Sequence, residues 1–307
     1  MTTPTDHPFH TVRDLVRYAV SRFSQAQLAF GHGSDNAYDE AAYLVLHTLH
    51  LPLDTLEPFY DARLTAAEIG DVLAIIERRA AERVPAAYLT HEAWMHGHRF
   101  HVDERVIVPR SFIGELLDDG LQPYVADPEQ VGAVLELCTG SGCLAILAAG
   151  AFPNADIDAV DLSAGALEVA EINRRDYGLD ARIALHHGDL YAPLPAARRD
   201  DADARYDVIL TNPPYVNAAS MAALPPEYRH EPEMALAGGE DGMDIVRRIV
   251  RDARRWLKDD GVLVVEIGNE RSHVEAAFGG LDLIWLPTSA GDDNVFLIHA
   301  ADLPAVA

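Results

Sequence analysis

The sequence predicts an α/β fold, in which a small N-terminal helical bundle precedes a mostly parallel, seven-stranded sheet. From Val131 onward, short apolar runs alternate with stretches of helical periodicity, as is typical of parallel strands joined by helices. Before about residue 88, apolar residues instead recur at helical spacing. The 307 residues, 49% of them apolar, exceed what one compact core usually needs. We therefore expect a helical domain at 1–87, a hairpin linker at 88–110 and a larger domain at 111–307.

Three helices are expected in the N-terminal part. The first begins at Val12, the second begins after Asp35 or Asn36 and stops before Pro52, and the third runs to Glu82. Two of them start with a capping box, in which a threonine and an acid three residues later satisfy free N–H groups: Thr11 with Asp14, and Thr65 with Glu68.

A β-hairpin is expected between Tyr88 and Pro109, because the apolar pattern changes there towards alternation around Gly97. Four histidines cluster in this hairpin, namely His91, His96, His98 and His101. A metal site is one interpretation of the cluster. The absence of a nearby cysteine favours the other, in which the histidines face solvent or form hydrogen bonds.

The larger domain alternates strands and helices. Strands are expected at Ala133–Leu137, Ile157–Asp161, Ile183–His187, Val208–Thr211, Val262–Ile267, Leu283–Leu286 and Val295–His299. Helices are expected at Leu144–Phe152, Gly165–Tyr177, Gly242–Trp256 and Arg271–Phe278, with a charged surface loop at Arg198–Arg205. The uncharged segment 137–155 is long enough to span a bilayer, but three glycines, Pro153 and Asn154 interrupt it, so we interpret it as strand, loop and helix.

The charge balance, 24 basic against 49 acidic residues, gives a net charge of −25. Such a chain is not expected to grip bare nucleic acid or an anionic membrane, and it favours a basic partner, unless the charge serves only solubility. Two cysteines, Cys138 and Cys143, leave no disulfide framework. The first eleven residues lack the apolar stretch of a signal peptide, so we expect a cytoplasmic protein.

The first chemical motif is the glycine turn in Leu135–Gly142, which follows a strand and precedes a helix. Glycines there let a ligand approach the backbone, and the helix N-terminus offers free N–H groups. Together with Asp161, about twenty residues later, the turn also satisfies a dinucleotide fingerprint, which leaves a nicotinamide dehydrogenase open. Glu136 would attract a ligand's ammonium group and repel a pyrophosphate, and Asp189 would accept a hydrogen bond from an adenine amino group, although either could be an ordinary strand-end acid.

The second motif is Asn212-Pro213-Pro214-Tyr215, directly after a strand. Two consecutive prolines hold an extended turn and leave backbone carbonyls free, since neither proline donates a hydrogen bond. The carbonyls of Asn212 and Pro213 can accept both hydrogens of a planar NH₂ group, with Tyr215 as a flat wall. This pattern favours chemistry on an amide or exocyclic nitrogen over a plain turn.

These two motifs resemble those of class I S-adenosylmethionine-dependent methyltransferases that modify such nitrogens. The helical N-terminal part, the hairpin and Val106–Arg110 make the chain similar to the bacterial protein-glutamine methyltransferases. One branch of that family acts on peptide-chain release factors and usually continues Pro-Asp-Thr-Glu after Pro-Arg. Here Ser111–Leu116 follows instead, which resembles the branch that acts on protein three of the large ribosomal subunit. Phe112 departs from a proline expected in that branch, and Cys138 replaces a glycine before the turn.

The resemblance implies methyl transfer from S-adenosylmethionine to a glutamine side-chain nitrogen of that ribosomal protein, with S-adenosylhomocysteine as product and no metal. It implies Asn212, Pro213 and Tyr215 as catalytic residues, and a substrate site formed by Asn212, Pro213, Pro214, Tyr215 and Arg110. It places the cofactor at Glu136, Cys138, Thr139, Gly140, Ser141, Gly142, Asp161, Leu162, Asp189, Leu190 and Asn212. An adenine-N6 methyltransferase is disfavoured by the acidic charge. A dehydrogenase gives no reason for the second motif, and a non-catalytic module would bind the donor without turnover.

Overall fold

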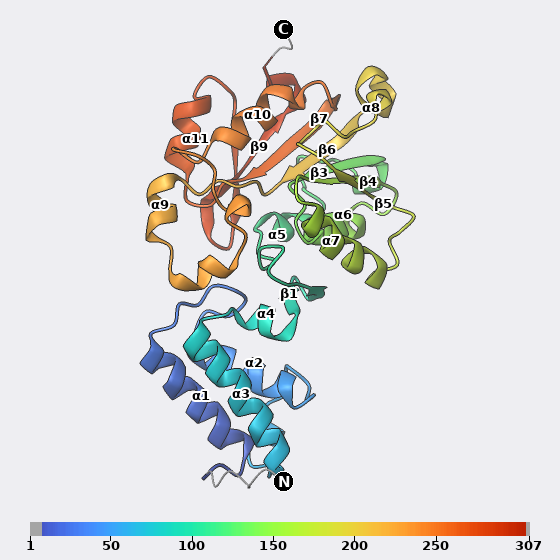
Figure 1. Ribbon diagram of the computed structural model, residues 1–307. Helices are drawn as coiled ribbons and strands as arrows, with labels where there is room; N and C mark the ends of the chain where they lie inside the picture. The colour runs from blue at the N-terminus through green and yellow to red at the C-terminus, as the bar shows by residue number, and fades with distance from the viewer. Residues whose placement is uncertain (1–7, 305–307) are drawn as a thin grey trace. The chain divides into compact units, whose positions relative to one another are not determined.

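The computed structural model describes residues 8–304 and divides into two compact units (Figure 1). The helical unit comprises the chain through Ala93, Val102–Glu104 and Pro225–His230. The sheet unit comprises Trp94–His101, Arg105–Leu224 and the chain from Glu231 onward. Residues 225–230, which lie in the range expected for the larger domain, thus pack with the N-terminal helices.

The helical unit contains the three expected helices, α1 (Val12–Ala26), α2 (Ala37–Thr48) and α3 (Ala66–Glu82), and a short α4 (Ala86–Thr90) that the sequence did not predict. Both capping boxes are present, and Asn36 rather than Asp35 caps α2. The apolar faces of α1, α2 and α3 form one core with Phe23, Leu44 and Ile76 fully buried. Two 3₁₀ helices also belong to this unit, η1 (Glu57–Phe59) and η4 (Pro226–His230).

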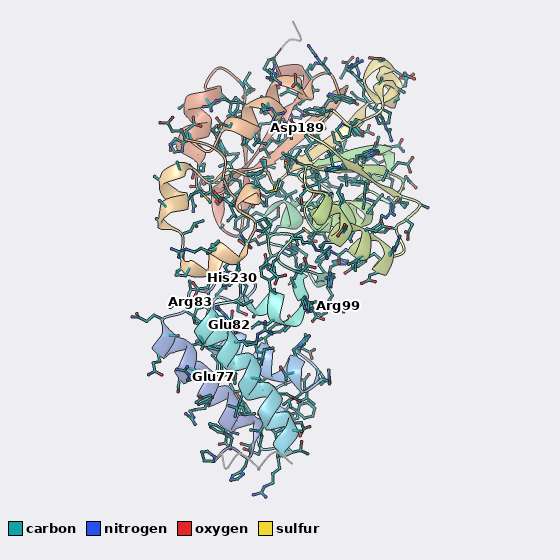
Figure 2. The ribbon with its side chains drawn as sticks, viewed as in Figure 1. Glu77, Glu82, Arg83, Arg99, Asp189 and His230 are labelled. Carbon is teal, nitrogen blue, oxygen red and sulfur yellow. The ribbon has the colours of Figure 1, made fainter. Side chains whose placement is uncertain are left out.

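A buried ionic cluster joins residues 225–230 to the helices. Arg79 donates to Glu40 at 2.7 Å, with both side chains almost fully buried. Glu227 accepts hydrogen bonds from the Ala29 N–H at 3.1 Å and from the Arg83 guanidinium at 2.7 Å. Figure 2 shows Arg83 beside Glu82 and His230, whose ring lies 3.0 Å from the Glu82 carbonyl oxygen. Buried charges need such partners, because an isolated one is costly.

The predicted hairpin is confirmed as β1 (Glu92–Met95) and β2 (His98–His101). Its turn residues His96 and Gly97 have φ of 50° and 74°, the left-handed pair that a two-residue hairpin loop requires. Three of the histidine rings have separate partners: the His91 ring lies near the Val102 carbonyl, the His96 ring near Asp118 and the His98 ring against the Tyr177 ring. At His101 the backbone N–H donates to the Asn173 side chain. Among residues 8–304, no group of three or more His, Cys, Asp or Glu side chains is placed to hold a metal ion.

The sheet unit is built on seven strands in the order β5-β4-β3-β6-β7-β9-β8. Strands β3 to β7 are parallel, and β9 is antiparallel to both β7 and β8, so the expected mostly parallel sheet is confirmed. The strands are β3 (Ala133–Leu137), β4 (Asp156–Asp161), β5 (Ile183–His187), β6 (Tyr206–Thr211), β7 (Leu257–Glu266), β8 (Ile284–Thr288) and β9 (Gly291–His299). Two strands begin well before the expected residues, β7 by five residues and β9 by four. Their first residues are mostly polar, so they show no apolar run, yet they still belong to the sheet.

Helices cover both faces of the sheet. On one face lie α5 (Ile113–Asp118), α6 (Cys143–Ala151) and α7 (Ala164–Asp176), and on the other α10 (Asp244–Ala253) and α11 (Arg271–Phe278). The helices α5, α8 (Ala196–Asp200) and α9 (Ala218–Ala223) were not predicted. Short 3₁₀ helices complete the unit: η2 (Pro128–Gln130), η3 (Ala202–Ala204), η5 (Glu233–Ala235) and η6 (Ala300–Asp302).

The prediction of a surface loop at Arg198–Arg205 was wrong, because α8 and η3 occupy most of it. Arg198 is held by contacts within the protein instead of facing only solvent. Its guanidinium lies 3.1 Å from the buried Asp158 carboxylate and over the Tyr206 ring. The uncharged segment 137–155 is confirmed as the end of β3, a turn and α6. Within the part of the chain that the structure describes, no helix combines the length and hydrophobicity needed to cross a membrane.

Candidate active site

A cavity opens where the strand order reverses, between β3 and β6, at the carboxyl ends of the parallel strands. Open parallel sheets bind ligands at such a switch point. The cavity measures about 850 Å³ including its open mouth, which is the size range of a small-molecule site. Of the predicted site residues it is lined by Cys138, Gly140, Asp161, Leu162, Asp189, Leu190, Asn212 and Pro214.

The glycine turn after β3 is left-handed at three positions. Cys138, Gly140 and Gly142 have φ of 61°, 56° and 78°. At Gly142 a side chain would also approach the Cβ of Ala170 to 3.2 Å, so glycine is needed there for conformation and for space. Cys138 adopts the conformation that the more usual glycine would adopt freely, and thus keeps the turn tight.

Asp161, the last residue of β4, fastens this turn to the next strand. One carboxylate oxygen accepts the Gly140 N–H at 2.8 Å, and the other accepts the Ser163 N–H at 2.8 Å. Burial raises the pKa of the carboxyl, and these two N–H donors oppose that rise. Each oxygen keeps a second lone pair, so the carboxylate can still accept hydrogen bonds from a ligand in the cavity.

Glu136 and Thr139 lie behind the turn rather than on the cavity wall. The Glu136 carboxylate is buried and accepts the Thr139 hydroxyl at 2.5 Å. Burial raises the pKa of Glu136 to about 8. Ser141 and Gly142 likewise are not among the lining residues. The resemblance placed all four on the cofactor; none of them lines the cavity, and their contact with the cofactor stays a prediction.

Asp189, labelled in Figure 2, follows β5 and is one of the residues that line the cavity. Its carboxylate accepts a hydrogen bond from Arg248 of α10 at 2.6 Å, and its side chain is 48% exposed. Leu162 and Met234 are large apolar side chains on the wall that are half or more exposed. A polar rim over apolar walls suits a ligand with an aromatic ring and edge hydrogen-bonding groups.

Asn212 reaches the same cavity from the end of β6. Its side-chain Nδ2 donates to the Arg110 carbonyl oxygen at 3.4 Å, which directs Oδ1 away from that carbonyl. Pro214 also lines the cavity, whereas Pro213 and Tyr215 do not. The Tyr215 ring packs instead close to Gly268, where an added Cβ would lie 2.8 Å from Tyr215 Cε2. The structure therefore brings Asn212 and Asp161 to the same cavity, whereas the predicted roles of Pro213 and Tyr215 stay predictions.

Arg110 does not line the cavity either. Its guanidinium forms a two-pronged ion pair with Glu231, with nitrogen–oxygen distances of 2.5 and 2.6 Å. The expected contact of Arg110 with a substrate stays a prediction.

Sequence reasoning missed several lining residues. They are Arg105, Val106 and Ile107 before α5, Val160, Ser163, Ala166 and Gly188 near the ends of β4 and β5, Pro232, Met234, Ala235 and Ala237 after the loop through residues 225–230, and Ile245 at the start of α10. Glu231, the partner of Arg110, was also missed as part of the site. The stretch 106–110 did carry a signal, since it contributed to the resemblance, but neither spacing nor periodicity shows that it meets Glu231 in space.

Comparisons with known proteins agree with this geometry. Residues 113–224 match the family described as "Methyltransferase small domain". The chain is 81% identical over 306 residues to the ribosomal protein uL3 glutamine methyltransferase of Burkholderia pseudomallei, covering 100% of this chain and 99% of that protein. It is 62% identical to the protein of the same name from Bordetella pertussis, covering 95% and 96%. The one from Neisseria gonorrhoeae is 58% identical, covering 95% of each chain.

Proposed function

The chain belongs to the ribosomal protein uL3 glutamine methyltransferases, and from that premise we propose that it methylates the side-chain amide nitrogen of a glutamine in ribosomal protein uL3. Its sheet unit has the class I methyltransferase fold. One observation on this chain supports the proposal: Asn212, Asp161 and Gly140 line the same cavity. In the proposed reaction, the turn at Asn212 binds the glutamine amide and the glycine turn at Gly140 binds the methyl donor.

The proposed methyl donor is S-adenosylmethionine, and the cavity suits it. The Asp161 carboxylate is placed to accept ribose hydroxyls, and the exposed Leu162 and Met234 side chains offer apolar surface to an adenine ring. Gly140 exposes backbone where a side chain would meet no atom within 4 Å, so a ligand can approach closely. When bound, this donor supplies a methyl group already activated by the sulfonium.

The acceptor nitrogen needs orientation, because an amide nitrogen is a poor nucleophile. The proposed role of Asn212 Oδ1 and the Pro213 carbonyl is to accept the two N–H groups of the glutamine amide and aim its nitrogen at the methyl group. The nitrogen–carbon bond forms as the carbon–sulfur bond breaks, and a proton then leaves the nitrogen to solvent. Both hydrogen bonds strengthen as the nitrogen becomes positive, which lowers the activation barrier. In other enzymes one such preorganised dipole is worth about 2.7–4 kcal/mol.

The charge of the chain supports the proposed partner. A ribosomal protein is basic, and a net charge of −25 favours its encounter with this chain. We place the reaction in the cytoplasm. The two free thiols, Cys138 and Cys143, suit a reducing compartment.

A direct assay tests the proposal. Purified protein is incubated with radiolabelled S-adenosylmethionine and either uL3 or a peptide-chain release factor at equal concentration, and the labelled peptide is mapped by mass. We expect one labelled glutamine in uL3 and little label in the release factor. Preference for the release factor would overturn the substrate and keep the chemistry, whereas label on any residue other than glutamine would overturn the chemistry.

A further inference from the structure

We propose that Glu231 is a positioning residue for the methyl transfer, acting on the Asn212 side chain through Arg110. The inference rests on the proposed function of Asn212 and adds to it a residue that touches neither donor nor glutamine. It starts from a chain of contacts inside the sheet unit that runs from Glu231 to the cavity wall.

Glu231 is tied to the segment before α5 by three hydrogen bonds. Its Oε1 accepts the Val108 N–H at 2.9 Å and Arg110 Nη1 at 2.5 Å, and its Oε2 accepts Arg110 Nη2 at 2.6 Å. The Glu231 side chain is 0% exposed and that of Arg110 30%. Parallel N–H···O bonds between a guanidinium and a carboxylate fix both angle and distance, so this pair defines the position of the Arg110 backbone.

A second carboxylate holds the far side of the same segment. Glu266, the last residue of β7, accepts the Ser111 hydroxyl at 2.5 Å and the Phe112 N–H at 2.9 Å. The Arg110 carbonyl therefore lies between two anchored points, Val108 on one side and Phe112 on the other. That carbonyl is the acceptor for Asn212 Nδ2.

The orientation of the Asn212 amide is what this anchoring controls. An asparagine amide has an acceptor oxygen and a donor nitrogen of nearly equal size, so a half-turn exchanges them at little steric cost. With Nδ2 held by the Arg110 carbonyl, Oδ1 is the atom left to accept from the glutamine nitrogen. The flipped amide would set its NH₂ against the NH₂ of the substrate. Displacing the Arg110 carbonyl removes the preference between these two states.

The test uses Glu231→Gln, which keeps the size of the side chain but weakens its grip on the guanidinium. We expect kcat for uL3 methylation to fall about tenfold, equivalent to about 1.4 kcal/mol, while the Kd for S-adenosylhomocysteine stays within about twofold. Asp158→Asn is the matched control. Asp158 is also a buried carboxylate paired with an arginine, Arg198 at 3.1 Å, but neither residue lines the cavity. This control should lose comparable thermal stability and keep its kcat.

A double-mutant cycle separates positioning from general damage. In an Asn212→Ala background, Glu231→Gln should lower kcat no further, because the side chain it positions is gone. Equal fold-losses in both backgrounds, or an unchanged kcat in the single variant, would overturn the inference. Should Glu231→Gln fail to fold, Arg110→Lys replaces it in the same cycle, since lysine cannot form the two-pronged pair.

A readout that needs no turnover distinguishes this inference from the proposed function. The Asn212 side-chain NH₂ is followed by nitrogen-15 NMR in the wild type and in Glu231→Gln. We expect its resonance to shift or broaden in the variant and to stay unchanged in Asp158→Asn. An unchanged Asn212 resonance would refute the positioning role even in an active enzyme, and an inactive wild type with the expected shift would refute only the proposed reaction.

Discussion

Replacing Asp161 by alanine should weaken binding of S-adenosylhomocysteine, the stable product, without unfolding the sheet unit. The Asp161 carboxylate lies on the cavity wall and already accepts the Gly140 and Ser163 N–H groups, each at 2.8 Å. Alanine therefore removes the proposed acceptor for the ribose hydroxyls and also releases the glycine turn. Both effects lower affinity, and the second also lowers stability.

The magnitude follows from hydrogen bonds to a charged group. Each is worth about 1.5–3 kcal/mol when lost from a partly buried site. Loss of one such interaction with the ligand raises the Kd by about 10- to 150-fold, since about 1.4 kcal/mol corresponds to a factor of ten.

Isothermal titration calorimetry with S-adenosylhomocysteine measures the change, and Asp207→Ala is the control. Asp207 likewise accepts two backbone N–H groups, those of Gly132 and Ala133 at 2.9 Å each, but it lies at the amino end of β6, away from the cavity. Its variant should lose stability and keep its affinity. An Asp161→Ala protein that binds within about threefold of the wild type, or an Asp207→Ala protein that loses as much affinity, would refute the reasoning.

Four further outcomes are expected. Asn212→Ala should lower kcat by about a hundredfold or more and leave donor affinity nearly intact, because the Asn212 side-chain carbonyl matters most as the acceptor nitrogen becomes positive. A loss of donor affinity in calorimetry with no change in kcat would show that Asn212 binds the donor. Raising the ionic strength to about 0.5 M, where the Debye length is roughly 4 Å, should raise the KM for uL3 more than that for the donor, and equal changes would argue against electrostatic steering. Glu136 has a pKa raised to about 8, so its contribution to stability is full below the usual pKa of 4.5 and is lost as the pH rises through about 8. The unfolding temperature of Glu136→Gln should accordingly fall less between about pH 6 and 9 than that of the wild type. Parallel plots of unfolding temperature against pH would contradict the raised pKa. Cys138→Gly should keep donor affinity and stability within about 1 kcal/mol of the wild type, because glycine adopts the left-handed conformation freely. Cys138→Val should lose more donor affinity and stability. The reverse order would show that the packing of the Cys138 side chain outweighs its backbone strain.

Local signals in the sequence predicted the elements whose formation is decided locally. The capping boxes at Thr11 and Thr65 mark helix starts that the structure confirms, since the cap and its acid are only three residues apart. Strand β3, which is buried along its whole length, is apolar except for Glu136 and was predicted to the residue. The start of β7 gives no such run, because the polar residues Lys258, Asp259 and Asp260 follow the buried Leu257 and are partly or fully exposed.

The candidate site divides in the same way. Residues at the carboxyl ends of parallel strands, such as Asp161 and Asn212, could be placed at one sheet edge from the order of strands alone. The contacts of a single side chain could not be predicted in this way: the Glu136 carboxylate is bound by the Thr139 hydroxyl and the Ala145 backbone of α6 and does not line the cavity. The pairing of Arg110 with Glu231 spans 121 residues and depends on tertiary packing that no local pattern contains.

The three-part make-up of the helical unit also affects when it can finish folding. Helices α1 to α3 are complete by Glu82, yet the Ala29 N–H and the Arg83 guanidinium bind a carboxylate, Glu227, that the ribosome adds much later. About 130 residues separate the end of the unit's first segment from Glu227, and at roughly 5–20 residues per second their synthesis takes about 7–25 s. Throughout that interval the nascent helices lack the acceptor that closes their ionic cluster. The part of the protein that is made first is therefore among the last to reach its final packing.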